Sequence, residues 1–289
     1  MIDRKFLTCA AATAVLASLG TGLAHGAVLV DTNGFEPGGS PETYAGLQSN
    51  GNDGRDLVGQ NNWLSFAGTS SIKVTRNRTL TGDQSLRSNT GTRGAARAFT
   101  LTPDPAGTDL TVFGTIGNDA NDDSGFGDIA LTSSTGGFDL LRVRREGGAD
   151  GFAAFASSDG VNELAGDTVQ LGPDGNPTAY EVSLTLRYNV GTDDDQARVQ
   201  YREIGSTTWL NLSPVASATL DADGFADLGY DLPTGTLYLA VQADNPDFPV
   251  SVRIDDLLVS SEVIPEPGSL MLLSLGGVAL LGRCRRRTD

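Results

Sequence analysis

The residue types that most often carry catalysis are confined to the two ends of this chain of 289 residues. The single histidine is His25, and the two cysteines are Cys9 and Cys284. The stretch between residues 27 and 264 therefore contains neither residue type. This excludes an internal disulfide, a zinc site built from His or Cys, a thiolate nucleophile and a Ser-His-Asp triad in that stretch.

Carboxylates remain for acid and base chemistry, and glutamate is scarce among them. A retaining glycosidase needs two carboxylates about 5 Å apart across the sugar bond, which alternate positions of one strand can supply. The central stretch shows no Glu-x-Asp-x-x-Glu spacing among its seven glutamates, which are Glu36, Glu42, Glu146, Glu163, Glu181, Glu203 and Glu262. We therefore predict no catalytic residues. A secreted carbohydrate-active enzyme that relies on carboxylates alone is the alternative.

One acidic run has the spacing of a calcium loop. Residues 221–227 read DADGFAD, which resembles an Asp-x-Asp-Gly-x-x-Asp core in which oxygens converge on one ion and glycine permits the bend. Thr219 and Tyr230 stand where the helix-flanked loop has its first Asp and its bidentate Glu. Calcium is the only cofactor that the sequence suggests, with Asp221, Asp223 and Asp227 as its ligands. A polar Asp-Gly turn is the competing interpretation.

The tryptophans and the remaining acidic loops are less specific signals. Trp63 and Trp209 offer flat rings of the kind that stack on sugars, but both are expected in the core. The acidic segments 118–123 and 193–195 are expected to be solvated hairpin tips.

Charge limits the partners of the central stretch. Residues 27–264 carry 14 basic and 33 acidic side chains, a net charge of −19, and Lys73 is the only lysine among them. A field of this sign repels nucleic acid and anionic membrane surfaces, so we expect no nucleic-acid partner.

Hydrophobic periodicity predicts strands. Residues 180–190 alternate without a break, with Tyr180, Val182 and Leu184 on one face, as expected of a strand with one buried side. A Gly-Thr-Asp-Asp-Asp turn then leads into a second alternating run that ends at Tyr201, which predicts a hairpin. Comparable runs occur at residues 71–75, 95–101, 110–116, 126–132, 138–144, 151–156, 237–243 and 250–259.

These strands and the lack of a convincing helix between the ends predict an all-β fold of two packed antiparallel sheets. Four loose motifs in residues 31–37, 58–63, 82–86 and 253–257 resemble those of exported domains of the concanavalin A-like jelly-roll type. That resemblance implies that the first and last strands pair and that these segments meet. A galactose-binding-like or immunoglobulin-like sandwich is the alternative.

The first 26 residues are expected to be a removable signal peptide. Arg4 and Lys5 precede an apolar run over residues 6–19, and small residues then allow cleavage after Ala24 or Gly26. This predicts export through a secretion translocase.

The last residues, 263–289, form an ordered tail. Its elements are Pro265-Glu266-Pro267, an apolar segment at about residues 269–282, and the basic residues Arg283, Arg285, Arg286 and Arg287. At about 1.5 Å per residue, the 15 uncharged residues from 268 to 282 span roughly 22 Å, short of a hydrocarbon core of about 30 Å. The arginines place the C-terminus inside the cell.

This tail resembles the PEP-CTERM sorting signal of bacterial exported proteins. The resemblance implies a transmembrane helix that holds the protein in the inner membrane until an exosortase cuts near Pro265-Glu266-Pro267. Cell surface or extracellular matrix is then the final location, with residues 27–262 as the β-sandwich domain. The function expected of that domain is non-catalytic, with polysaccharide binding as the hypothesis and a purely structural matrix role as a further alternative.

Overall fold

The computed structural model describes residues 26–37, 44, 54–75, 80, 84–88, 91–118, 125–138, 140–146, 151–157, 163–170, 179–189, 195–216, 218–244 and 252–263. The predicted signal peptide up to residue 25 and the sorting tail beyond Val263 lie outside these residues. Within the part of the chain that the structure describes, no helix is both long and apolar enough to cross a membrane.

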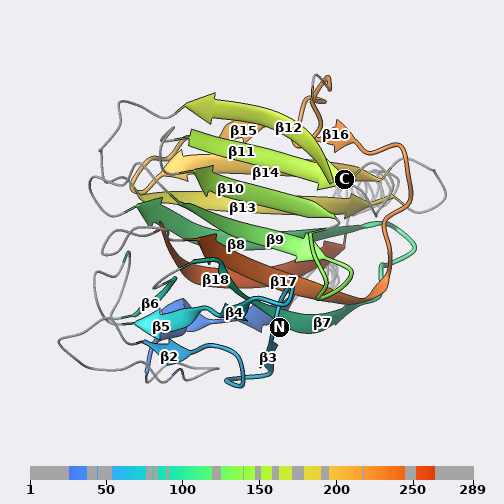
Figure 1. The fold of residues 1–289 in the computed structure, drawn as a ribbon. Helices are drawn as coiled ribbons and strands as arrows, with labels where there is room; N and C mark the ends of the chain where they lie inside the picture. Colours follow the sequence, from blue (N-terminus) through green and yellow to red (C-terminus); the bar gives the residue numbers. More distant parts are fainter. Residues whose placement is uncertain are drawn as a thin grey trace, which may run out of the picture.

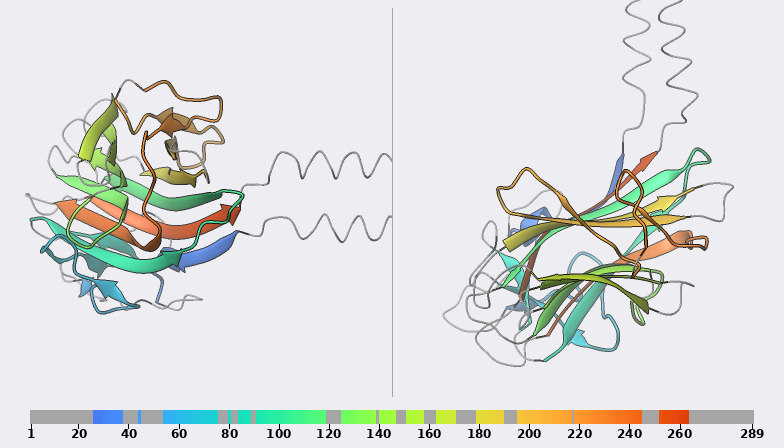
Figure 2. Two further views of the ribbon diagram at one scale, coloured as in Figure 1. Left: turned by 90° about the vertical axis from the view of Figure 1, so that its right-hand side faces the viewer. Right: turned by 90° about the horizontal axis from the view of Figure 1, so that it is seen from above.

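Two sheets pack face to face, as Figures 1 and 2 show. Sheet A has the order β15 (Leu210–Leu212), β14 (Gln196–Glu203), β13 (Ala179–Tyr188), β8 (Thr108–Asn118), β18 (Val252–Val263), β6 (Ser85–Arg87), β5 (Lys73–Thr75) and β2 (Arg55–Asp56). Two more strands join it, β1 (Ala27–Asp31) on β18 and β16 (Ala226–Asp227) on β14.

Sheet B has the order β12 (Glu163–Gln170), β11 (Gly151–Ser157), β10 (Leu141–Glu146), β9 (Phe126–Thr132), β17 (Gly235–Asp244), β7 (Arg93–Leu101) and β3 (Trp63–Leu64). The short β4 (Ser70–Ser71) pairs with β7 in parallel, whereas the other described pairs are antiparallel. The one described helical element is the 3-10 turn η1 (Asn33–Phe35). The prediction of an all-β, two-sheet sandwich is confirmed.

The core lies between the inner faces of the sheets. In the predicted hairpin, β13 pairs with β14 from Tyr180 to Arg187, and Val182, Leu184 and Leu186 are fully buried against the facing sheet. The intervening residues of β13 point to the outer face of sheet A because side chains alternate along a strand.

The two ends of the domain meet in sheet A. Ala27 pairs with Ser261, and Ile254 of β18 pairs with Leu86 of β6. Thr32 fixes the junction, because its N–H donates to the Leu257 carbonyl at 3.0 Å and its hydroxyl accepts the Leu257 N–H at 3.0 Å. The prediction that the first and last strands pair is therefore confirmed. Figure 2 shows β1 and the end of β18 side by side at one end of the sandwich.

Two strand predictions need correction. The strand β12 at Glu163–Gln170 was not predicted, since its sequence ELAGDTVQ contains few strand-forming residues. It is an edge strand, and its Gly166 lies so close to the backbone that an added Cβ would be 2.4 Å from the Ser213 carbonyl oxygen. The strand expected from Phe138 begins at Leu141 instead, because Phe138 lies in a loop with its ring centroid 4.9 Å from that of Phe66.

Candidate functional site

The sequence-predicted calcium residues lie in a turn at one end of sheet A. The Asp221 Oδ1 accepts the backbone N–H of Asp223 at 2.9 Å and that of Phe225 at 2.8 Å, which closes the turn. Gly224 has φ +85°, a conformation that favours glycine. Asp227 begins a second turn by accepting the Gly229 N–H at 2.8 Å.

The same turn packs Phe225 onto the outer face of sheet A. Its ring is buried beneath two guanidinium groups, 3.8 Å from Arg187 Cζ and 4.5 Å from Arg198 Cζ. Arg198 also donates to the Asp223 carbonyl oxygen at 3.1 Å. No three His, Cys, Asp or Glu side chains among the described residues are placed to share a metal ion. Calcium ligation by this turn therefore stays a prediction; the Phe225 carbonyl, which such a loop would direct at the ion, accepts the Asp221 N–H at 2.9 Å.

The acidic segment at 193–195 is not wholly a solvated tip. Asp195, its one described residue, is buried and accepts backbone N–H groups of Asn189 and Leu232, both at 2.7 Å. Burial raises the pKa of Asp195, and the two backbone hydrogen bonds lower it in part. The carboxylate thus joins two loops and is not free for chemistry.

The two tryptophans have different environments. Trp63 is in the core as predicted, where its ring N–H donates to the Tyr44 hydroxyl at 3.1 Å. Trp209 is partly exposed, which corrects the expectation of a second core tryptophan. It precedes the edge strand β15 and lies opposite Arg202 on the outer face of sheet A.

The ring of Trp209 extends from the edge of sheet A over the neighbouring strands of that face. Its ring is 4.4 Å from Arg202 Cζ on β14 and 6.0 Å between centroids from Phe113 on β8, in an edge-to-face arrangement. Because β13 runs between β14 and β8, the two rings approach each other over β13, where Ser183 is only 8 % exposed.

Polar side chains surround the indole. Arg202 forms an ion pair with Glu181, and the two side chains are 26 % and 23 % exposed. On the same strand as Arg202, the half-buried Gln200 donates its Nε2–H to the Oδ1 of the exposed Asn211 on β15 at 2.9 Å. We call this set the Trp209 platform; it comprises Phe113, Glu181, Ser183, Gln200, Arg202, Trp209 and Asn211. It combines a flat ring with planar hydrogen-bonding groups, the combination that sugar recognition requires.

The outer face of sheet B carries a related group of side chains around a buried carboxylate. Asp128 is fully buried and is held bidentately by Arg144, at 2.8 Å to Nε and 3.0 Å to an Nη, and by Arg142 at 3.4 Å. Phe155 lies 4.2 Å from Arg142 Cζ, and Phe126 lies 3.9 Å from Arg144 Cζ. Burial raises the pKa of Asp128, and the two arginines act in the opposite direction. We call these five residues the Asp128 cluster.

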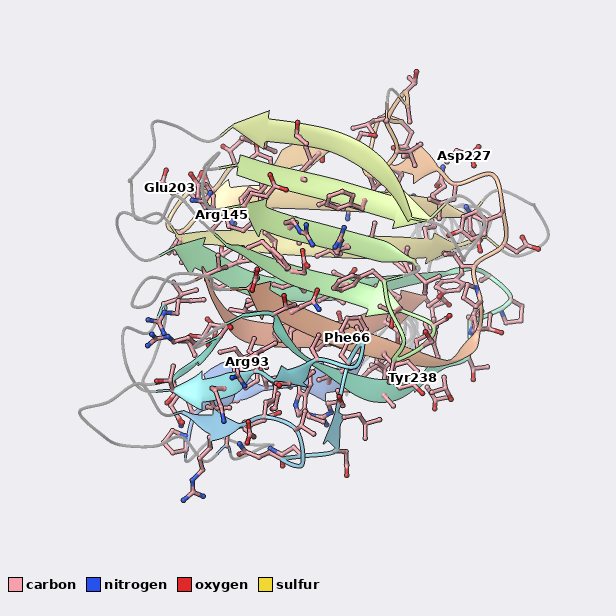
Figure 3. All side chains as sticks on the ribbon, viewed as in Figure 1. Phe66, Arg93, Arg145, Glu203, Asp227 and Tyr238 are labelled. Carbon is pink, nitrogen blue, oxygen red and sulfur yellow. The ribbon has the colours of Figure 1, made fainter. Side chains whose placement is uncertain are left out.

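A small apolar group covers the rest of that face. Phe66 is fully buried there against Ala96, Ala130 and Ala240, whose small side chains leave room for its ring. Tyr238 packs against the same group and stays partly exposed (Figure 3). The covering loops are joined by the Ala67 N–H, which donates to the Thr135 carbonyl at 2.8 Å.

Sequence reasoning found Trp209 but not its setting. The alternation in residues 180–190 already placed Glu181 and Ser183 on the polar face, and the predicted hairpin could have paired Ser183 with Gln200. The position of Phe113 on the adjoining strand could not be read in the same way, because β8 is distant in sequence. Figure 3 shows Glu203 and Asp227 at opposite ends of β14, where the strand ends and where β16 joins it.

The tail that follows this domain matches a known sorting motif. Residues 263–287 match the PEP-CTERM protein-sorting motif. The match begins at Val263, the last residue of β18, so the motif follows the folded domain directly. Comparison with curated proteins gives no match.

Solved structures similar to this chain include sugar-binding domains. The VIP36 exoplasmic/lumenal domain in a Ca²⁺/Man3GlcNAc-bound form is 11 % identical, with TM-score 0.42 and coverage of 71 % of this chain and 87 % of that one. Lectin UEA-II complexed with galactose is 12 % identical, with TM-score 0.37 and coverage of 72 % and 99 %. The CBM2 module of the Lactobacillus casei BL23 phage J-1 evolved Dit is 11 % identical, with TM-score 0.44 and coverage of 84 % and 99 %.

Proposed function

We propose that this chain is a non-catalytic protein of the cell surface or extracellular matrix that an exosortase processes and that binds polysaccharide through the Trp209 platform. Two separate observations support the two parts of the proposal. The sorting motif supports delivery and processing, and the partly exposed Trp209 supports binding.

Delivery follows from the order of the parts. The motif implies export and anchoring through the C-terminus before cleavage. The last strand of the domain that precedes the motif, β18, is paired with the first strand, β1, beside the residue where the motif begins. Cleavage within the tail would therefore release the sandwich with all its strands.

Binding follows from the chemistry of the platform. Trp209 combines a large apolar ring with a low cost of ordering, since two torsions define it. Glu181, Arg202, Gln200 and Asn211 place charged and neutral hydrogen-bonding groups within one patch of sheet A. Hydroxyl groups of a sugar both donate and accept, which such a mixed set can satisfy.

Processing is tested by the intact mass of the protein recovered from the surface of its host. We expect a chain that ends within the 263–289 segment. A mature surface protein that still ends at Asp289 would refute processing. Loss of processing on replacing Pro265, Glu266 and Pro267 by alanine, together with retention in the membrane fraction, would assign the cut to the motif.

Binding is tested on the exported protein with dextran, pullulan, laminarin, mannan and the extracellular polysaccharide of the host. We expect retention on at least one polymer, and Trp209→Ala should weaken it about 30-fold, the effect of a dominant contact of about 2 kcal/mol. Trp209→Phe should retain part of the affinity. Tyr238→Ala removes a partly exposed aromatic ring from the opposite face and should leave binding unchanged.

The non-catalytic part has its own test. The same polymers incubated with the exported protein should keep their length distribution. Shortened chains that Trp209→Ala no longer produces would replace the proposal with a carbohydrate-active enzyme.

A further inference from the structure

The charges around the Trp209 platform are already paired. Glu181 forms an ion pair with Arg202, and Asp109 holds Arg187 bidentately at 2.8 and 2.9 Å. The hydrogen bonding that Arg187 donates to Asp109 raises the pKa of Arg187, so this guanidinium is stabilised as a cation by its own partner.

The third arginine of this face is also engaged. Arg198 lies over Phe225 and donates to the Asp223 carbonyl oxygen, and burial lowers its pKa. Each of the three arginines that the structure describes on the outer face of β13 and β14 thus has a bound acceptor. An anionic ligand would have to displace a carboxylate or a carbonyl to reach one of them.

The surroundings of the platform are acidic. Glu203 follows Arg202 and is exposed, and the turn at the other end of β14 carries exposed Asp221 and Asp223. The whole stretch from 27 to 264 has a net charge of −19. At low ionic strength such a field lowers the local concentration of anions and their rate of association.

The hydrogen-bonding groups that remain beside the ring are neutral. The amides of Gln200 and Asn211 bond to each other at an exposed position, and each amide has both donor and acceptor atoms. Neutral amides suit hydroxyl groups, which need no compensating charge.

We infer that the Trp209 platform selects an uncharged polysaccharide and rejects polymers that carry carboxylate or sulfate groups. This inference rests on the proposed function, because it names the ligand class of that same platform. The rejection comes from paired arginines and the acidic surroundings, and the attraction comes from the indole and the two amides.

The test compares neutral and anionic polymers at two salt concentrations. The exported protein is titrated with dextran, pullulan, laminarin and mannan and with alginate and polygalacturonate, at about 20 and about 300 mM NaCl, where the Debye length falls from about 20 Å to below 8 Å. We expect a neutral polymer to bind equally well at both concentrations, in a manner that depends on Trp209. Alginate and polygalacturonate should not bind at low salt.

A charge variant sharpens the test. Glu181→Gln keeps the shape of the side chain and leaves Arg202 with a neutral neighbour, so alginate binding should become detectable at low salt, where the unmodified protein shows none. Trp209-dependent binding of alginate by the unmodified protein, stronger at low salt than at high salt, would overturn the selectivity and leave polysaccharide binding intact. Absence of binding to every polymer would overturn the proposed function itself.

Discussion

The outer faces of the two sheets carry similar groups at different depths. On sheet B, Asp128 is fully buried and is held by two arginines that stack on phenylalanine rings. On sheet A, Glu181 pairs with Arg202 beside Trp209, and both charged side chains are about a quarter exposed. The acid is therefore internal on one face and accessible on the other, although guanidinium and aromatic groups accompany it on both.

The burial of the charged pair decides whether it contributes mainly to stability or is available to a ligand. A buried charge that loses its partner is strongly destabilising, whereas an exposed pair contributes little to stability because water already solvates both ions. The Asp128 cluster is consequently bound to the fold, and changes in it should appear as lost stability. The Trp209 platform can change with little effect on the fold, which leaves it available for a ligand.

The largest predicted difference is between Asp128→Ala and Glu181→Ala. The first leaves Arg142 and Arg144 without their buried carboxylate and should lower the free energy of unfolding by about 3–5 kcal/mol. The second should cost about 1 kcal/mol or less. Urea denaturation followed by tryptophan fluorescence measures both.

Asp128→Asn is the control for shape. It keeps the size of the side chain and removes its charge, so a loss similar to that of Asp128→Ala would assign the effect to the charge. Equal losses for Asp128→Ala and Glu181→Ala would contradict the distinction between the two faces.

The aromatic side chains of the two faces should differ next. Phe66→Ala leaves a cavity over Ala96, Ala130 and Ala240 and should cost about 3 kcal/mol. Trp209→Ala removes a larger ring, but one that is partly exposed, and should cost less than half as much. Thermal unfolding of both variants in parallel checks the order. A greater loss for Trp209→Ala would mean that the indole is needed mainly to cover sheet A.

Lysine substitutions give a smaller contrast. Arg144→Lys loses a bidentate contact with Asp128 and the stacking on Phe126, which an ammonium group cannot reproduce, and should cost about 1.5–3 kcal/mol. Arg202→Lys should cost less than about 1 kcal/mol, since its ion pair with Glu181 is partly solvated. The same urea titrations serve here, and a reversed order would place the more rigid ion pair on sheet A.

The sequence could predict those features of the two outer faces that depend on residues close together in the chain, and not those that depend on distant contacts. The alternation in residues 180–190 predicted both the strand and the polar side of it, because a period of two is a local property. Comparable runs predicted strands at 126–132 and 138–144, and the pairing of these strands brings Asp128 opposite Arg144. Neither the burial of that pair nor the position of Phe138 could be read locally, since both depend on loops that fold over the sheet.

Trp209 shows the other limit. Trp63 and Trp209 have similar neighbouring residues in the sequence, and both were expected in the core. Trp63 lies on β3, where it faces Phe35 and Tyr44 across the interior. Trp209 precedes a three-residue edge strand, so its side depends on the pairing of β15 with β14, which no local pattern specifies.

The smallest effect should come from calcium at the turn beside the platform. The Asp221 carboxylate is already used by two backbone N–H groups, and Arg198 donates to the Asp223 carbonyl oxygen. A cation there would compete with the hydrogen bonds that Asp221 accepts and would lie close to the positive charge of Arg198, so about 5 mM calcium should leave the unfolding temperature unchanged. A ligand at 100 times its dissociation constant would add about 2.7 kcal/mol and a clear upward shift. Such a shift, abolished in Asp221→Asn and unaffected in Glu181→Gln, would establish the calcium site that the spacing of Asp221, Asp223 and Asp227 predicts.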